Sequence, residues 1–233
     1  MHQFYIHDIQ NIEFSKSQKH QIKNVLRMRE NDLVRVVDVN GQGAVVSLRD
    51  DEAQNVEVVE PITFKEKKRK LKIIASLIRN ERLEWMIQKA AETGVDELVL
   101  YKADHGVVKS YGSKETRKLE RFNTIALEAS EQAMRQFPLL ITEIIDKNEL
   151  ASHLGTCNLV ADTLEHKHFL DVIEDAGDVC VITGPEGGFS EEERKLFASL
   201  HIQSVTLGDT ILRAETAPLA ISILFSAVHG RGK

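Results

Sequence analysis

Short apolar runs alternate with stretches of helical periodicity through the last two thirds of this 233-residue chain. The runs are rich in β-branched residues, which is typical of buried strands. They cover residues 71–78, 98–101, 139–145, 157–161, 179–183 and 204–207. Between them, apolar residues recur at helical spacing, and Trp85 and Phe122 fall at core-like positions of two such helices, so we expect both to pack rather than to stack on a base. The alternation predicts an α/β fold, with a mostly parallel sheet covered by helices on both faces.

The first 60 residues lack this alternation and indicate a small β-rich module. Two strand-like runs meet across Asn40-Gly41, a dipeptide that favours a hairpin turn, and a third run follows. These runs cover residues 33–39, 44–48 and 55–59. Residues 60–69 contain Pro61 and many charges, which favours a linker. We therefore predict two domains, 1–69 and 70–233.

A short helix is expected between residues 15 and 28, with Ile22, Val25 and Leu26 on its inner side. Cations on or beside its outer side form a local basic patch: His20, Lys23, Arg27 and Arg29. Such a patch suits a nucleic-acid backbone, although a merely solvated face is the alternative. The charged residues 65–70 allow the same two interpretations, contact with a nucleic-acid backbone or a merely solvated segment.

Composition narrows the class of protein. A hydrophobic content of 42% suits a packed core, and a net charge of -6 argues against nucleic-acid binding by bulk electrostatics alone. No stretch is long enough to span a membrane, which favours a cytoplasmic protein. Cys157 and Cys180 lie in predicted strands and are expected to be reduced core residues. The histidines lack metal-ligand spacing, and the pair His166 and His168 is expected in a surface loop.

Two glycine breaks stand out near the C-terminus. The run 179–183 ends in the segment 184–188 (GPEGG), and Ser190 followed by Glu193 has the spacing of a capping box at a helix start. The acids 191–193 make this helix start a poor phosphate site, so we expect an uncharged or cationic ligand at the glycine loop.

The second break is Gly208, which follows the run 204–207 and opens an irregular loop that reaches to Pro218. Residues 219–228 are apolar nearly all round before Gly230. We expect this last helix to be buried in a domain core or a subunit interface.

Several blocks resemble one known family in the same order along the chain. They are GPEGGFS with its acidic helix start, ILRAETA at 211–217, ERLEWMIQKAAETGVDEL at 81–98, EASEQAMR at 128–135 and HQIKNVLRMRENDLV at 20–34. The chain thus resembles the RsmE family, 16S ribosomal RNA uridine-N3 methyltransferases of the knotted SPOUT class. The resemblance covers most of the chain.

The resemblance implies a PUA-like RNA-binding barrel in 1–69 and a trefoil-knotted domain in 70–233 that binds S-adenosyl-L-methionine. It implies a homodimer in the cytoplasm, acting on 16S ribosomal RNA in the small subunit, with no membrane or metal. The implied cofactor-binding residues are Gly184, Pro185, Glu186, Gly187, Gly188, Leu207, Gly208, Ile211, Leu212 and Arg213. At two places the chain departs from the family pattern: His2-Gln3 and His105-Gly106 stand where an Arg and an Arg-Ser pair are usual.

Methylation of N3 of uridine requires removal of the imide proton and stabilisation of the resulting anion. We expect Arg135 to stabilise that anion and Arg213 to hold RNA phosphate. Glu215 either orients an arginine or caps the last helix.

Two alternatives to this function remain open at this stage. In the first, the chain is a methyltransferase of the same class that acts on another RNA or another uridine. In the second, it is a non-catalytic RNA-binding or ribosome-assembly protein with the same fold. A nucleotide-phosphate enzyme is disfavoured, because the glycine segment lacks the Lys-Ser/Thr ending of a P-loop.

Overall fold

The computed structural model describes residues 1–164, 167–174 and 176–229, so the expectations for His166 and Gly230 lie outside the described residues. The chain divides into two compact units. Unit 1 contains Met1–Glu66 and Ser130–Pro138, and unit 2 contains Lys67–Ala129 and Leu139–Lys233. The sequence predicted one boundary near residue 69 and did not assign 130–138 to the first unit.

The described part of unit 1 contains a four-stranded sheet in the order β1-β2-β3-β4. Its strands are β1 (His2–Tyr5), β2 (Leu33–Val37), β3 (Gly43–Leu48) and β4 (Val56–Ile62). The predicted hairpin is present as the antiparallel pair β2 and β3, and Gly41 in its turn has φ +77. Strand β1 was not predicted and pairs with β2 in parallel. Strand β4 continues into the predicted linker through Pro61, which an edge strand tolerates.

The predicted short helix consists of α1 (Lys16–His20) and a π-helical turn, η1 (Gln21–Val25). Ile22 is buried as expected, but the expectation for Val25 was wrong, because its side chain is 65% exposed. The π-turn closes i to i+5 hydrogen bonds, so side chains in it depart from α-helical spacing.

Residues 130–138 belong to unit 1 because they are hydrogen-bonded to β1. Gln3 Nε2 donates to the carbonyl of Arg135 at 2.6 Å, and the Tyr5 hydroxyl donates to the same carbonyl at 2.8 Å. The backbone N–H of Tyr5 donates to Glu131 Oε1 at 3.1 Å. Burial is the main reason why the pKa of Tyr5 lies above its ordinary value, so its hydroxyl stays a donor.

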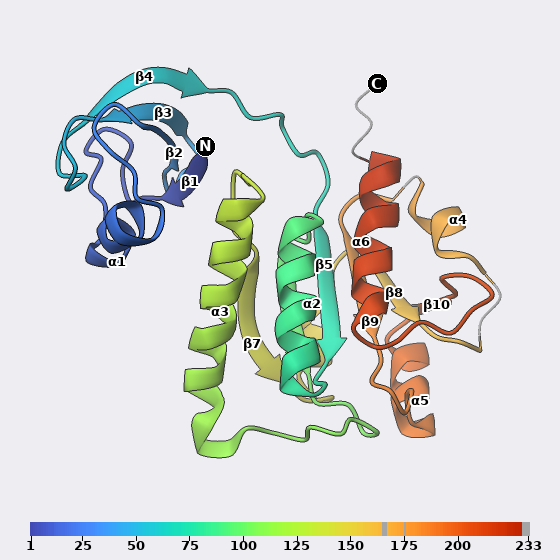
Figure 1. The fold of residues 1–233 in the computed structure, drawn as a ribbon. Helices are drawn as coiled ribbons and strands as arrows, with labels where there is room; N and C mark the ends of the chain where they lie inside the picture. Colours follow the sequence, from blue (N-terminus) through green and yellow to red (C-terminus); the bar gives the residue numbers. More distant parts are fainter. Residues whose placement is uncertain (165–166, 175, 230–233) are drawn as a thin grey trace. The chain divides into compact units, whose positions relative to one another are not determined.

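The described part of unit 2 contains a six-stranded sheet in the order β10-β8-β9-β5-β6-β7 (Figure 1). The strands are β5 (Leu71–Ser76), β6 (Glu97–Tyr101), β7 (Leu140–Ile145), β8 (Cys157–Ala161), β9 (Val179–Thr183) and β10 (Gln203–Val205). Every neighbouring pair is parallel. All six predicted strands and the parallel sheet are confirmed.

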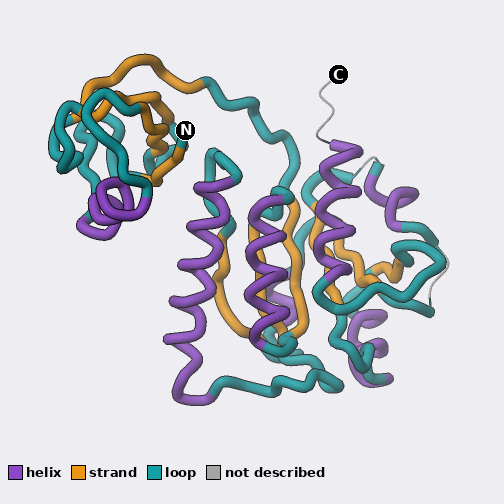
Figure 2. The backbone as a smooth tube through the Cα atoms, in the orientation of Figure 1, coloured by secondary structure: helices purple, strands orange, loops and turns teal. Residues whose placement is uncertain are grey.

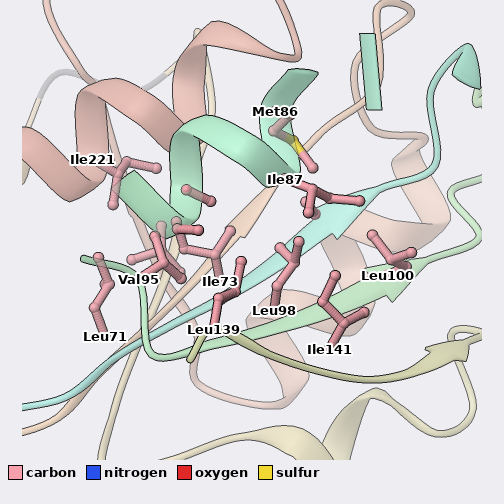
Figure 3. Packing of buried hydrophobic residues seen from close by; sticks show 14 of the residues in the cluster. Leu71, Ile73, Met86, Ile87, Val95, Leu98, Leu100, Leu139, Ile141 and Ile221 are labelled. Carbon is pink, nitrogen blue, oxygen red and sulfur yellow. The ribbon is translucent and has the colours of Figure 1, made fainter. Parts of the chain in front are cut away.

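Helices cover both faces of this sheet, as predicted. Their bounds are α2 (Asn80–Glu92), α3 (Glu115–Gln132), α4 (Phe169–Ile173), α5 (Glu191–Ser199) and α6 (Thr216–His229), with short 3-10 turns η2 (Gly112–Lys114) and η3 (Leu150–His153). Alternate residues of β5 point to opposite faces. Ile73 packs in the core under α2, α3, α4 and α6, whereas Ile74 packs in the core that includes α5. Figure 2 shows α2, α3 and α6 as neighbouring helices, and Figure 3 shows part of the first core.

One expectation about burial was wrong. Phe122 is fully buried as expected, but Trp85 is 41% exposed. In α6, Ile221 and Phe225 are buried, while Ile223 is 52% exposed. Helix α6 packs against α2, α4 and β5, and the apolar side around Ile223 faces outward. Its burial in a subunit interface stays a prediction.

Candidate active site

The site lies at the edge of the unit 2 sheet where the strands end. Because all strands are parallel, their carboxyl ends meet at this edge, the usual ligand position in open α/β sheets. Residues 184–190 after β9 form what we call the first loop, and residues 206–215 after β10 form the second loop. The start of α2 follows β5, and the turn with Asp104 and His105 follows β6.

Glycines let the first loop fold tightly on one side. A β-carbon at Gly184 would lie 3.1 Å from the ring of Phe189, and one at Gly187 would lie 2.9 Å from Cβ of His105. His105 Nδ1 is also 3.3 Å from the carbonyl oxygen of Gly187. Gly188 has φ +69, and a β-carbon there would meet open space. Phe189 and His105 therefore pack closely against the first loop at Gly184 and Gly187, whereas the space beside Gly188 is open.

The predicted capping box at the start of α5 is confirmed. Ser190 Oγ accepts from the N–H of Glu193 at 3.1 Å, and Glu193 Oε2 accepts from the N–H of Ser190 at 2.8 Å. Glu193 is fully buried, so of the three acids in this turn only Glu191 and Glu192 are exposed. Lys147 lies 3.2 Å from Glu192. The acidic turn thus carries less free negative charge than its sequence indicates.

Asp104 ties the first loop to the end of β6. Its Oδ2 accepts a hydrogen bond from Ser190 Oγ at 2.7 Å, and Lys147 Nζ lies 3.3 Å from the same oxygen. These contacts, with the Ser190 bond first, hold the pKa of Asp104 below its ordinary value although burial acts against them. Asp104 therefore stays charged and anchors the loop. This role gave no local signal in the sequence, because Asp104 is distant in sequence from Ser190.

The second loop combines a turn that requires glycine with exposed apolar groups. Gly208 has φ +132, and Thr206 Oγ1 donates to its carbonyl at 3.0 Å. Leu207 is half-buried against the core, whereas Ile211 is 83% exposed. An apolar side chain this exposed, beside a glycine turn, is available to pack on a ligand.

Arg82 of α2 contacts one carboxylate from each loop. Its Nη1 lies 3.5 Å from Glu186 Oε1 in the first loop, and its Nε lies 3.8 Å from Glu215 Oε1 in the second. Glu215 thus lies beside an arginine, as one of its two expected roles requires, and it also directly precedes α6. The sequence analysis did not identify Arg82 as that arginine, because the three residues are far apart along the chain.

Two buried polar atoms at these loops lack hydrogen-bond partners among the described residues: Thr183 Oγ1 and Glu215 Oε2. Thr183 directly precedes the first loop, and Glu215 ends the second. A buried polar group left unpaired costs about 1–3 kcal/mol, which a ligand with polar atoms offsets. The loops therefore fit a ligand that has both apolar and hydrogen-bonding parts.

The two arginines predicted for catalysis belong to different units. Arg213 is exposed in the second loop of unit 2, where its carbonyl accepts from the N–H groups of Thr216 and Ala217. Arg135 belongs to unit 1. The contact of each with RNA stays a prediction.

The four cations predicted to bind RNA are all exposed residues of unit 1. Two of them face acids: Lys23 pairs with Glu52, and Arg29 lies 3.4 Å from Asp51. His20 Nδ1 lies 2.9 Å from Asn24 Nδ2, and Arg27 has φ 55. The patch is therefore partly neutralised by neighbouring acids.

Two other kinds of site are absent from the described residues. No helix there is long and apolar enough to cross a membrane, and no cluster of His, Cys, Asp and Glu there has the size of a metal site. Both cysteines are free thiols, and burial raises the pKa of Cys180 to about 12, which makes it unreactive.

The class that this fold and site define is the RNA methyltransferase domain, whose family model matches residues 65–226. A ribosomal RNA small subunit methyltransferase E from Bacillus subtilis is 29% identical over 86% of this chain and 83% of the relative. The protein of that name from Mesomycoplasma hyopneumoniae is 30% identical over 72% of this chain and 74% of the relative. The chain therefore belongs to the RNA methyltransferase domain family, in its ribosomal RNA small subunit methyltransferase E group.

A solved structure supports the fold. The crystal structure of a ribosomal RNA small subunit methyltransferase E from Neisseria gonorrhoeae, bound to S-adenosyl methionine, superimposes with a TM-score of 0.87. It covers 97% of this chain and 97% of its own, at 24% identity. That relative thus shares the α/β fold with the parallel sheet described above.

Proposed function

We propose that this enzyme transfers a methyl group from S-adenosyl-L-methionine to N3 of a uridine in the 16S ribosomal RNA of the small subunit. One observation carries the proposal: two glycine loops meet the carboxyl edge of a parallel sheet and leave two buried polar atoms for a ligand. The names of the relatives support ribosomal RNA of the small subunit as the substrate.

The residues at this edge fit the proposed cofactor. Residues 184–188 and Gly208 bring backbone groups to the ligand, while Leu207, Ile211 and Leu212 pack on its apolar part. Thr183 and Glu215 offer the buried oxygen atoms. When bound, the cofactor supplies an activated methyl group, and the absence of a bulky side chain at Gly188 leaves room for it.

Arginines act on the RNA in this proposal. Arg213, exposed in the second loop, holds a phosphate of the substrate, and Arg135 stabilises the anion of the uridine ring after its N3 proton has left. The target base leaves its stack to reach the methyl group.

For the whole chain we propose the architecture of the family. Residues 1–69 are a PUA-like barrel that binds RNA through its exposed cations, which the sheet β1-β2-β3-β4 supports. Residues 70–233 hold a trefoil knot, a feature proposed from the family alone. Two copies form a homodimer in the cytoplasm, and the outward apolar side of α6 around Ile223 supports that assembly.

The test is transfer of labelled methyl from S-adenosyl-L-methionine to small ribosomal subunits that lack the modification. Mass spectrometry of nuclease digests then identifies the product. A 3-methyluridine in 16S RNA is the expected result. No transfer to the subunits, with the cofactor still bound in calorimetry, would redirect the search to other RNAs. Failure to bind the cofactor while RNA still binds would favour a non-catalytic RNA-binding protein.

A further inference from the structure

Glu215 is a buried carboxylate with an incomplete set of partners. The residue is 8% exposed, and its Oε2 has no hydrogen-bond partner within the described part of the chain. Its other oxygen, Oε1, lies 3.8 Å from Arg82 Nε, beyond hydrogen-bonding distance. A carboxylate removed from water is stable only when donors or positive charge surround it.

Arg82 alone does not supply that charge. Its guanidinium also lies 3.5 Å from Glu186, so one positive charge faces two carboxylates. Counted formally, one guanidinium and two carboxylates carry a net charge of about -1. A further N–H donor, best a cationic one, is therefore missing beside Glu215.

Helix capping does not explain Glu215. The residue directly precedes α6, but among the described contacts the N–H groups of Thr216 and Ala217 donate to the carbonyl of Arg213 instead. The third residue of the helix start, Pro218, has no N–H. The start of α6 is therefore formed without the Glu215 carboxylate, which stays available for a ligand.

We infer that Glu215 accepts a hydrogen bond from an N–H group of a ligand bound at the two loops, and that Arg82 is a positioning residue that holds the carboxylate there. The inference rests on the proposed function, which offers three N–H sources. They are the α-ammonium of S-adenosyl-L-methionine, the N6 amino group of its adenine and the imide N–H of the target uridine. The deficit of positive charge around Glu215 favours the ammonium.

The decisive variant is Glu215→Gln, which keeps the shape and removes the charge. Binding is measured by calorimetry with S-adenosylhomocysteine and with 5′-methylthioadenosine, which lacks the amino-acid part. If the donor is the ammonium, the Kd for S-adenosylhomocysteine rises about tenfold or more and that for 5′-methylthioadenosine stays unchanged. If the donor is the adenine amino group, which both nucleosides carry, both Kd values rise. If the donor is the imide, both Kd values stay unchanged and kcat/KM for the RNA falls about tenfold or more.

A second measurement separates a ligand contact from a structural ion pair. The Tm of the unliganded Glu215→Gln protein should be unchanged or higher, because an incompletely paired buried charge is removed. Arg82→Gln should weaken S-adenosylhomocysteine binding, and Arg82→Lys should restore most of it. Glu120→Gln, an exposed acid on α3, is the matched control and should change neither binding nor Tm.

The outcomes distinguish this inference from the proposed function. Normal binding and normal turnover in Glu215→Gln overturn the role of Glu215 alone, as does a fall in its Tm with unchanged affinity. If the wild-type protein binds neither nucleoside, the proposed cofactor site and the inference are both wrong.

Discussion

Glu193 accepts a 2.8 Å hydrogen bond from the hydroxyl of Tyr101, and neither side chain reaches solvent. The same oxygen accepts from the N–H of Asp104 at 3.1 Å, while Oε2 accepts from the N–H of Ser190. One buried carboxylate thus joins the end of β6 to the start of α5. The first loop is consequently fixed at its far end by this hydrogen-bond network.

Tyr101→Phe should destabilise the protein by about 1–3 kcal/mol, because it removes a donor from a buried carboxylate at little change in volume. Burial, then the bond to Glu193, raises the pKa of Tyr101 above its ordinary value, so the donor is intact at neutral pH. Urea unfolding measures the loss. The control is Tyr111→Phe, whose hydroxyl bonds Asn80 in a more exposed place, and a loss as large there would contradict the argument.

The ion pair between Asp162 and Arg194 should make stability depend on acid pH. Arg194 Nε and Nη2 donate to the two Asp162 oxygens at 2.8 and 3.2 Å. Burial is the largest single influence and tends to raise the pKa of Asp162. The bond to Arg194, the charge of Arg194 and the backbone N–H groups of Thr163 and Leu164 together outweigh burial and leave the pKa below its ordinary value. Because the folded pKa is the lower one, the pair stabilises the fold above the unfolded pKa, and this contribution is lost as pH falls through the folded pKa.

The difference in unfolding free energy between wild type and Asp162→Asn should therefore be constant from about pH 7 to pH 5 and shrink below about pH 4. Urea unfolding at a series of pH values, followed by circular dichroism, measures it. If this difference in unfolding free energy does not change with pH, Asp162 stabilises the fold through its shape and not through its charge.

Gly187→Ala should reduce cofactor affinity about tenfold or more, because the added methyl group meets Cβ of His105 at 2.9 Å and displaces the first loop. Removing that carbon in the double variant Gly187→Ala with His105→Gly should restore part of the affinity. It should not restore all of it, because the His105 carbonyl would still lie 3.2 Å from the methyl group. Gly177→Ala, with open space around it, is the control, and equal losses in both single variants would refute the clash.

Local signals made much of unit 2 predictable. The strands of its sheet are apolar runs bounded by turn residues, and the spacing of Ser190 and Glu193 is enough to specify the capping box. Strand β1 gave no such signal, because four residues show no clear alternation and the strand depends on its pairing with β2.

Relations between distant residues could not be read from periodicity. Arg82 meets Glu186 and Glu215 only because three parallel strands bring their following segments to one edge. The assignment of 130–138 to unit 1 depends on hydrogen bonds from Gln3 and Tyr5, side chains more than a hundred residues away. Sequence reasoning found the loops of the site, but not the side chains that hold them in place.

Arg135→Ala should lower kcat about 10²-fold, if its guanidinium stabilises the uridine anion. Cofactor affinity should stay near that of the wild type, because Arg135 belongs to unit 1 and the loops belong to unit 2. Arg135→Lys keeps the charge and should retain more activity. Arg213→Ala should mainly raise KM for the RNA. Steady-state methyl transfer with calorimetry measures all three, and unchanged turnover in Arg135→Ala would refute that assignment.

Ile223→Asp should convert the proposed homodimer to a monomer. Ile223 is 52% exposed on α6, on the side opposite the buried Ile221 and Phe225, so its substitution changes the outer side without entering the core. A charge placed in an apolar interface is desolvated without a partner, which should raise the dimer Kd at least about 100-fold. Sedimentation velocity measures the change, and circular dichroism checks that the fold is kept.

Leu127→Asp, at an exposed apolar residue of α3, is the control and should leave the dimer intact. A wild-type chain that sediments as a monomer at micromolar concentration would refute the dimer. If both substitutions dissociate the dimer, the interface is not confined to α6.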